Sequence, residues 1–216
     1  MTILTDKRVV DIVAELYGDD PQFDDLLWPS ANAGVCVGLR RIDDNDVVVF
    51  RGSVTDQDFE RDFLAVPALS PIPQMGWVHP GFAEGLDATF ERVQPLLRRG
   101  NVRTIVCGHS LGAGRAALLG AALLVDEPTI NIQAVLFGEP RSGCKSLKAL
   151  WAHNPYRSYR NADPSGAGHD LITDVPPEPP YERNRALIDV FAKPAAGDPW
   201  SVFKYHHIQL YQAALA

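Results

Sequence analysis

One serine in this chain lies among unusually small residues. Residues 105–114 read IVCGHSLGAG, so an apolar run leads through Gly108 to Ser110, and Gly112 follows closely. Small residues are needed where a strand turns abruptly into a helix, because a Cβ atom there would collide with the turn. We therefore predict a sharp bend with the Ser110 hydroxyl at its apex. The helix that begins at Leu111 would direct free backbone N–H groups at the same point.

The pattern G-x-S-x-G is a weak signal by itself. Glycine and serine frequencies alone produce it in roughly one chain in twenty of this size. Its position here strengthens it, since it follows a strand-like apolar run and precedes a helix rich in small residues. We therefore interpret Ser110 as a nucleophile and not as part of an ordinary structural turn.

Strands and helices alternate through the middle of the chain. Hydrophobic spacing predicts helices over 6–17, 81–99, 111–125, 144–151 and from about 206, and strands over 35–42, 46–50, 104–107, 131–137 and 156–161. This order predicts an α/β fold with a mostly parallel central sheet flanked by helices, in a single domain over 1–216. Residues 162–182 contain several prolines and glycines, which excludes a regular element there.

Charge and cysteine content exclude several classes of function. The 216-residue chain has a formal net charge of −7 at pH 7, which disfavours binding to nucleic acid because phosphates would be repelled. No apolar run is long enough to span a membrane. The three cysteines lack metal-ligand spacing, and the N-terminus lacks a signal-peptide pattern. We therefore expect a reducing, cytoplasmic location, although a removed leader or another secretion route would also fit.

Four short segments follow one another along the chain: VVVFRGS at 47–53, WVHPGF at 77–82, CGHSLGAG at 107–114 and LFGEPRSG at 136–143. Taken in this order, they resemble segments of the class 3 lipases, the fungal-type triacylglycerol lipase family of the α/β-hydrolases. The resemblance runs from about residue 35 to the end and implies an α/β-hydrolase fold, a serine ester hydrolase and no cofactor. The chain departs from the family at Ala113-Gly114, in a long loop after residue 161 and in lacking the disulfides of secreted fungal members.

A serine nucleophile needs an imidazole to accept its proton and a carboxylate to orient that imidazole. In α/β-hydrolases both partners follow the serine in the chain. Asp163, Asp170 and Asp174 lie in the irregular loop after the strand at 156–161. Asp170, in HDLITDVPP, resembles the family's aspartate ahead of a Pro-Pro pair and is our choice. Asp163, in RNADP, is the main alternative, and Asp126 is a weaker candidate.

The segment YHHIQLY near the C-terminus offers two candidates for the base, His206 and His207. In the family a histidine near the C-terminus commonly stands five residues before a tyrosine, a spacing that His206 and Tyr211 keep. We therefore predict His206 as the base and keep His207 as the alternative. Adjacent histidines also occur as a structural pair or a weak metal site, but no third ligand lies at zinc spacing, so we expect no metal.

The oxyanion of an ester-cleaving intermediate needs hydrogen-bond donors, each of which lowers the barrier by about 3 kcal/mol. The backbone N–H of Leu111 is one such donor by its position after the serine. The resemblance implies Ser53, at the end of FRGS, as the other. Among the remaining histidines we expect His109 to support the bend by hydrogen bonding, His79 to be structural, and His153 and His169 to be surface residues.

Residues 53–76 form a candidate lid or surface segment. Thr55 and Asp58 could cap a short helix with Phe59 and Phe63 on one face. The resemblance implies an amphipathic lid that opens at a lipid surface, but an ordinary surface helix would have the same pattern. The segment is acidic, which disfavours anionic membranes. We therefore expect an acyl-ester pocket beneath it and only transient contact with a lipid surface.

These residues favour a serine carboxylic-ester hydrolase, a lipase or esterase that cleaves apolar acyl esters through an acyl-enzyme. A phospholipase, a feruloyl-type esterase or an acyltransferase would use the same machinery. A lipase-like protein that only binds partners is an alternative of another class, since a fold does not by itself confer activity. The presence of candidates for serine, acid and histidine favours the enzyme.

Overall fold

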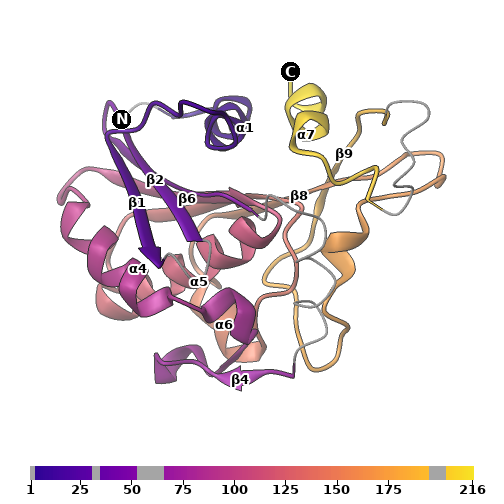
Figure 1. The fold of residues 1–216 in the computed structure, drawn as a ribbon. Coiled ribbons are helices and arrows are strands. Elements are labelled where there is room, and N and C mark those ends of the chain that lie inside the picture. Colours follow the sequence, from indigo (N-terminus) through magenta and orange to yellow (C-terminus); the bar gives the residue numbers. More distant parts are fainter. Residues whose placement is uncertain (1–2, 31–34, 53–65, 195–202) are drawn as a thin grey trace.

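The structure is a computed structural model that describes residues 3–30, 35–52, 66–194 and 203–216. A seven-stranded sheet runs through its centre with helices on both faces (Figure 1). In spatial order the strands are β1 (Asp25–Ser30), β2 (Val35–Ile42), β3 (Asn45–Phe50), β6 (Arg103–His109), β7 (Ile132–Phe137), β8 (Tyr156–Asn161) and β9 (Ile188–Val190). In this sheet β3, β6, β7, β8 and β9 are parallel to one another. The strand β2 pairs antiparallel with both β1 and β3. The predicted α/β class with a mostly parallel sheet is confirmed.

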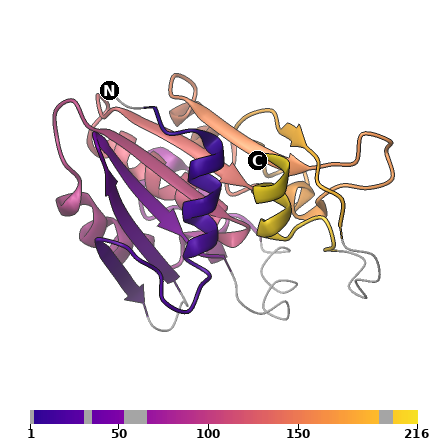
Figure 2. The ribbon, with the colours of Figure 1, turned by 90° about the horizontal axis from the view of Figure 1, so that it is seen from above.

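Two helices from opposite ends of the chain lie side by side on one face of the sheet. These are α1 (Asp6–Glu15) and α7 (Ile208–Ala214), and both views show them together (Figures 1 and 2). The Gln212 amide donates to Asp11 Oδ1 at 3.0 Å and links the pair. The other face carries α4 (Leu86–Val93), α5 (Leu111–Asp126) and α6 (Lys145–Leu150).

The central strands are buried on both faces because helices cover both. Alternate side chains of β3 therefore enter two different cores. Val47 and Val49 pack in the core beneath α1 and α7, whereas Val48 and Phe50 pack in the core beneath α5. No helix in the described part of the chain is long and apolar enough to cross a membrane.

The prediction of one continuous helix over 81–99 is wrong, because the structure breaks this segment into shorter helices. The structure has α3 (Pro80–Ala83), then α4, then a 3-10 helix at Gln94–Leu96. Gly85 between α3 and α4 has φ 72°, a left-handed conformation that ends a right-handed helix. Pro95 has no N–H to donate, so the α-helical ladder does not continue past Val93.

Some short elements were not identified from sequence. One is β1, a strand at the edge of the sheet. A small second sheet joins β4 (Ala68–Leu69) to β5 (Trp77–Val78), with a 3-10 helix at Pro73–Met75 between them. The proline-rich stretch after β8 contains one more 3-10 helix, at Leu171–Asp174.

Candidate active site

Ser110 lies at the bend between β6 and α5. Its backbone has φ 61° and ψ −130°, which is an uncommon conformation for a residue with a side chain. A Cβ atom at Gly108 would lie 2.5 Å from the backbone oxygen of Gly112. One at Gly112 would lie 2.8 Å from the carbonyl carbon of Phe50 and closer still to its oxygen. The bend therefore has the predicted geometry, and both glycines are required for it.

Asp170 and His206 form a buried pair. His206 Nδ1 lies 2.7 Å from Asp170 Oδ2, and the two residues are 8% and 1% exposed. The other oxygen of Asp170 accepts the Ile172 N–H at 2.9 Å, which fixes the carboxylate at the start of the Leu171–Asp174 turn. Because the carboxylate binds Nδ1, a proton exchange between His206 and a nucleophile would have to use the opposite ring nitrogen, Nε2.

The carboxyl end of β7 brings the serine and this pair together. Phe137, the last residue of β7, accepts the Ser110 N–H at 3.0 Å. The next residue, Gly138, has φ 57°, and a Cβ there would lie 2.7 Å from His206 Cε1 and 2.8 Å from Asp170 Oδ2. The site thus lies where parallel α/β sheets usually bind their ligands, at the carboxyl ends of the strands.

Tyr211 donates a second hydrogen bond to Asp170 Oδ2. Burial alone would raise the pKa of the Asp170 carboxyl, but the charge of His206 and the hydrogen bonds from His206 and Tyr211 together lower it below its usual value. The carboxylate therefore stays ionised and can hold the imidazole in one tautomer. In the sequence, Tyr211 was noted only for its spacing from His206, and its contact with the acid was missed.

The other acid candidates hold different groups. Asp163 accepts the backbone N–H and the hydroxyl of Ser165, at 2.8 Å and 2.6 Å, and so closes its own turn. Asp174 pairs with His169 at 2.6 Å. Asp126, at the end of α5, accepts the Gln94 amide at 3.3 Å. Asp170 is the candidate that the structure pairs with His206.

The remaining predicted positions differ in their surroundings. His207, the alternative base, is exposed and stands at the N-cap position of α7, where its side chain makes no capping hydrogen bond. Leu111 is buried and begins α5, where the first N–H groups have no acceptor within the helix. Ser53 lies outside the described residues, as does most of the candidate lid over 53–76.

His79, His153 and His169 differ in how far they are buried. His79 is buried, caps α3 by accepting the Gly81 N–H at 3.2 Å, and stacks on Phe82 with ring centroids 4.2 Å apart. His153 is exposed and His169 is partly exposed. Among the described residues no group of three or more His, Cys, Asp or Glu side chains could hold a metal ion.

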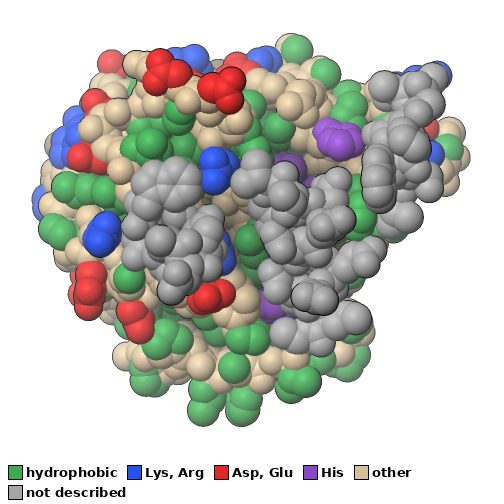
Figure 3. All heavy atoms as spheres, viewed as in Figure 1, with side chains coloured by type: hydrophobic (Ala, Val, Ile, Leu, Met, Phe, Trp, Pro, Cys, Tyr) green, Lys and Arg blue, Asp and Glu red, His purple; other side chains and the backbone are tan. Residues whose placement is uncertain are grey.

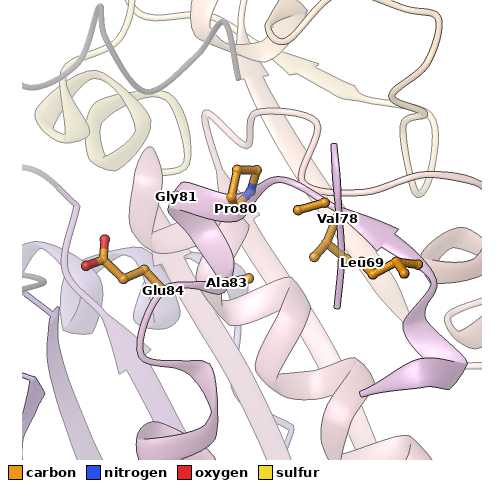
Figure 4. A pocket seen from close by; sticks show the side chains of 7 residues that line it. Leu69, Val78, Pro80, Gly81, Ala83 and Glu84 are labelled. Carbon is orange, nitrogen blue, oxygen red and sulfur yellow. The ribbon is translucent and has the colours of Figure 1, made fainter. Parts of the chain in front are cut away.

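A surface cavity of about 440 Å³ lies beside α3 (Figure 4). Its lining is apolar apart from Glu84, whose carboxylate points away from the side chains of Leu69 and Val78 in Figure 4. The helix α3 is close to the bend, since a Cβ at Gly114 would lie 3.1 Å from the Phe82 ring. The complete lining is Ala68, Leu69, Val78, Pro80, Gly81, Ala83 and Glu84.

Large apolar side chains are exposed near this cavity. Val66, Leu69 and Trp77 are 82%, 69% and 50% exposed. Figure 3 shows hydrophobic side chains gathered along the edge of the molecule where β4 lies in Figure 1.

Comparison with solved structures gives several matches. The chain is similar to the triacylglyceride lipase of Rhizomucor miehei, with 25% identity and a TM-score of 0.62 over 73% of this chain and 61% of that one. It is also similar to a mutant form of MDLA from Penicillium cyclopium, with 16% identity and a TM-score of 0.72 over 88% and 80% of the two chains. A lipase from Rhizopus microsporus var. chinensis is similar with 18% identity and a TM-score of 0.62, over 80% of this chain and 67% of that one. The last two likenesses, below 25% identity, show the fold alone.

The family assignment comes from the sequence match. Residues 47–179 match the family model described as lipase (class 3). The matched region contains the bend at Ser110, the turn at Gly138 and Asp170, which the structure brings together at the end of β7. Since the match covers more than half of the chain, this protein belongs to the class 3 lipase family.

Proposed function

We propose that this protein is a serine carboxylic-ester hydrolase, a lipase or esterase that cleaves apolar acyl esters through an acyl-enzyme. The observation that carries the proposal is the buried pair of His206 and Asp170 at the end of β7, where the backbone of Ser110 is also bound. Membership of the class 3 lipase family supports it. The Ser110 hydroxyl is buried and has no hydrogen-bond partner within the described ranges.

In the proposed mechanism, Ser110 Oγ attacks the ester carbonyl carbon while His206 Nε2 takes the hydroxyl proton. Asp170 stabilises the imidazolium that forms. The N–H of Leu111 stabilises the negative charge on the carbonyl oxygen, with Ser53 proposed as the second donor. His206 then gives its proton to the departing alcohol, and the acyl group stays on Ser110. Water repeats the sequence, with His206 as base, and releases the acid.

We propose apolar acyl chains as the substrate class because the cavity beside α3 is lined almost entirely by apolar side chains. The similar protein from Rhizomucor miehei is a triacylglyceride lipase, which supports lipid esters. Exposed Val66, Leu69 and Trp77 support transient contact with a lipid surface. A series of nitrophenyl esters from short to long acyl chains measures the preference. Equal rates on dissolved and emulsified ester would count against activation at a surface.

Covalent labelling tests the proposed nucleophile. A fluorophosphonate should add once to the wild-type protein, as read by intact mass, and Ser110→Ala should remove both the label and activity, the latter by about 10⁶-fold. Ser165→Ala is the matched control, since Ser165 lies in an exposed turn and should leave labelling intact. Failure of the wild type to label would favour the alternative of a lipase-like binding protein.

We also propose a cytoplasmic location. The three cysteines Cys36, Cys107 and Cys144 are unbridged, and burial raises the pKa of the Cys107 thiol, which keeps it unreactive. Reduced thiols fit a reducing compartment. Fractionation of cells with an antibody against the native protein tests this, and recovery from the medium would contradict it.

A further inference from the structure

A chain of hydrogen bonds links three distant parts of the sequence next to Ser110. The hydroxyl of Tyr17, which follows α1, accepts the Gly52 N–H at 2.9 Å and lies 3.1 Å from His109 Nδ1. The other ring nitrogen of His109, Nε2, lies 2.6 Å from the backbone oxygen of His206. One end of this chain is therefore the residue before Ser53, and the other end is the proposed base.

The direction of every bond in this chain follows from its two ends. A backbone N–H only donates and a carbonyl oxygen only accepts. Burial, together with the nearby His206, lowers the pKa of His109 to about 3, so its ring is neutral and has a single N–H. That N–H must be on Nε2, because a lone pair there would face the carbonyl oxygen of His206. Nδ1 is then the acceptor, and Tyr17 donates to it.

Close packing reinforces these bonds. The rings of His109 and His206 stack with centroids 4.5 Å apart at 29°. A Cβ at Gly52 would lie 2.5 Å from the Tyr17 hydroxyl oxygen and 3.2 Å from Ser110 Cβ. Burial raises the pKa of Tyr17 to about 12, so the hydroxyl keeps the proton that it donates. The Tyr17 hydroxyl thus binds both Gly52 and His109, the residue before the nucleophile, although Tyr17 lies outside the residues matched by the family model.

We propose that Tyr17 and His109 are positioning residues, which fix the backbone of His206 and the backbone of Gly52, just after β3, relative to Ser110. This inference rests on the proposed hydrolase function. Neither side chain takes part in bond making, and both act through the groups that they hold. Since a misplacement of about 1 Å can reduce turnover about 100-fold, a rigid link between base and oxyanion side should matter for kcat.

Tyr17→Phe tests the link with the smallest change. It removes the donor to His109 and the acceptor of the Gly52 N–H but keeps the ring. We expect kcat on a soluble ester to fall by about 10-fold to 100-fold while KM changes little, since the pocket is untouched. Tyr159→Phe is the matched control, because the Tyr159 hydroxyl also bonds to α1, through Asp6, without touching His109. If Tyr17→Phe keeps the wild-type kcat, or if both variants lose kcat equally, the proposal is wrong.

Two substitutions of His109 separate the ends of the link. A glutamine amide reaches the place of Nε2 and can still donate to the His206 carbonyl. An asparagine amide reaches only the place of Nδ1 and keeps the contact with Tyr17. We expect His109→Gln to retain more kcat than His109→Asn, because it preserves the bond that holds the base. The opposite order, or equal kcat for both, would contradict the assignment.

Nitrogen NMR of histidine-labelled wild-type protein tests the assignment without substrate. His109 should show a protonated Nε2 and a bare Nδ1, unchanged between about pH 5 and pH 8. In Tyr17→Phe its Nδ1 resonance should shift. A protonated Nδ1 in the wild type would overturn the inference. This measurement separates the two proposals, since a protein with this tautomer that fails to label with a fluorophosphonate would contradict only the hydrolase function.

Discussion

The nucleophile and its two partners are held by different kinds of structure. At the bend, backbone lies directly against backbone: the helix start at Gly112 touches the end of β3, and Gly108 touches Gly112. The pair of Asp170 and His206 lies on irregular chain around β9 and is held by hydrogen bonds, including those from Ile172 and Tyr211. Ser110 therefore depends on the absence of side-chain atoms, whereas its partners depend on the presence of particular polar groups.

The loop that carries Asp170 also depends on particular polar side chains, at the residues that follow Asp170. Arg141, in the turn after β7, donates to the backbone oxygens of Asp174 and Pro176. Arg183 donates to the backbone oxygen of Thr173. Charged side chains thus bind carbonyl groups that a strand or helix would have satisfied internally. Substitutions should therefore act through shape at the bend and through lost polar contacts in the loop.

The largest expected effect is on the acid. Asp170→Asn should lower kcat by about 10⁴-fold, because an amide cannot hold His206 in the productive tautomer. Asp163→Asn should leave kcat close to the wild-type value, since Asp163 only closes a turn with Ser165. Steady-state hydrolysis of a soluble nitrophenyl ester measures both. The reverse ranking would show that Asp163 is the acid.

The bend should respond to added atoms. Gly112→Ala places a Cβ against the backbone of Phe50, which cannot move without distorting β3, so the free energy of unfolding should fall by about 3 kcal/mol. Gly114→Ala, two residues along the same helix, meets only the Phe82 ring, which can shift. Because alanine favours a helix over glycine by about 1 kcal/mol, this control should change stability little. Urea unfolding of the two variants measures the difference, and equal losses would refute the backbone contact.

The hydroxyl of Tyr211 should matter less than the acid that it binds. Tyr211→Phe keeps the ring beside Phe137 and removes one donor to Asp170, a charged acceptor. Hydrogen bonds to charged groups contribute about 1.5–3 kcal/mol, so we expect kcat to fall about 10-fold and stability to fall by a similar free energy. Ester hydrolysis and urea unfolding of the same preparation give both values. Loss of stability with unchanged kcat would mean that the hydroxyl only anchors the loop.

The two regions also differ in how far the sequence predicts them. The bend could be predicted because its determinants, Gly108, Ser110 and Gly112, lie within five residues. The choice of Asp170 over Asp163 depended on resemblance to a family. Spacing does not indicate which carboxylate of a loop turns inward, since that depends on partners elsewhere in the chain.

Contacts between distant residues account for what was missed. Tyr17 is 92 residues from His109, and Tyr211 is 41 residues from Asp170. The residues next to either tyrosine in the sequence do not show that its hydroxyl binds a site residue, so each would be predicted as an ordinary core side chain. The break at Gly85 was missed for a related reason, because apolar residues at helical spacing continue across it.

A second buried carboxyl, that of Glu139, gives the stability of the protein a dependence on pH that the glycines of the bend do not. Glu139, in the turn after β7, is 2% exposed and accepts hydrogen bonds from Tyr156 and from Asn184. Burial raises the pKa of Glu139, although the hydrogen bond from Tyr156 and the nearby charge of Arg183 oppose the rise. The folded protein therefore keeps this proton to higher pH than the unfolded chain. The resulting stability is complete below the ordinary glutamic acid pKa and is lost as pH rises through the folded value.

Glu139→Gln should remove that loss, because the amide has a similar shape and no charge. Because the pKa of Glu139 is raised in the fold, the variant should have a larger unfolding free energy than the wild type at neutral pH and match it near pH 4. The bend contributes no such slope, since Gly108 and Gly112 act through shape. Gly114→Ala should thus keep a constant offset from the wild type when urea unfolding is repeated from about pH 4 to pH 8. A constant offset for Glu139→Gln as well would mean that Glu139 is ionised in the fold, with its charge held by Arg183 nearby.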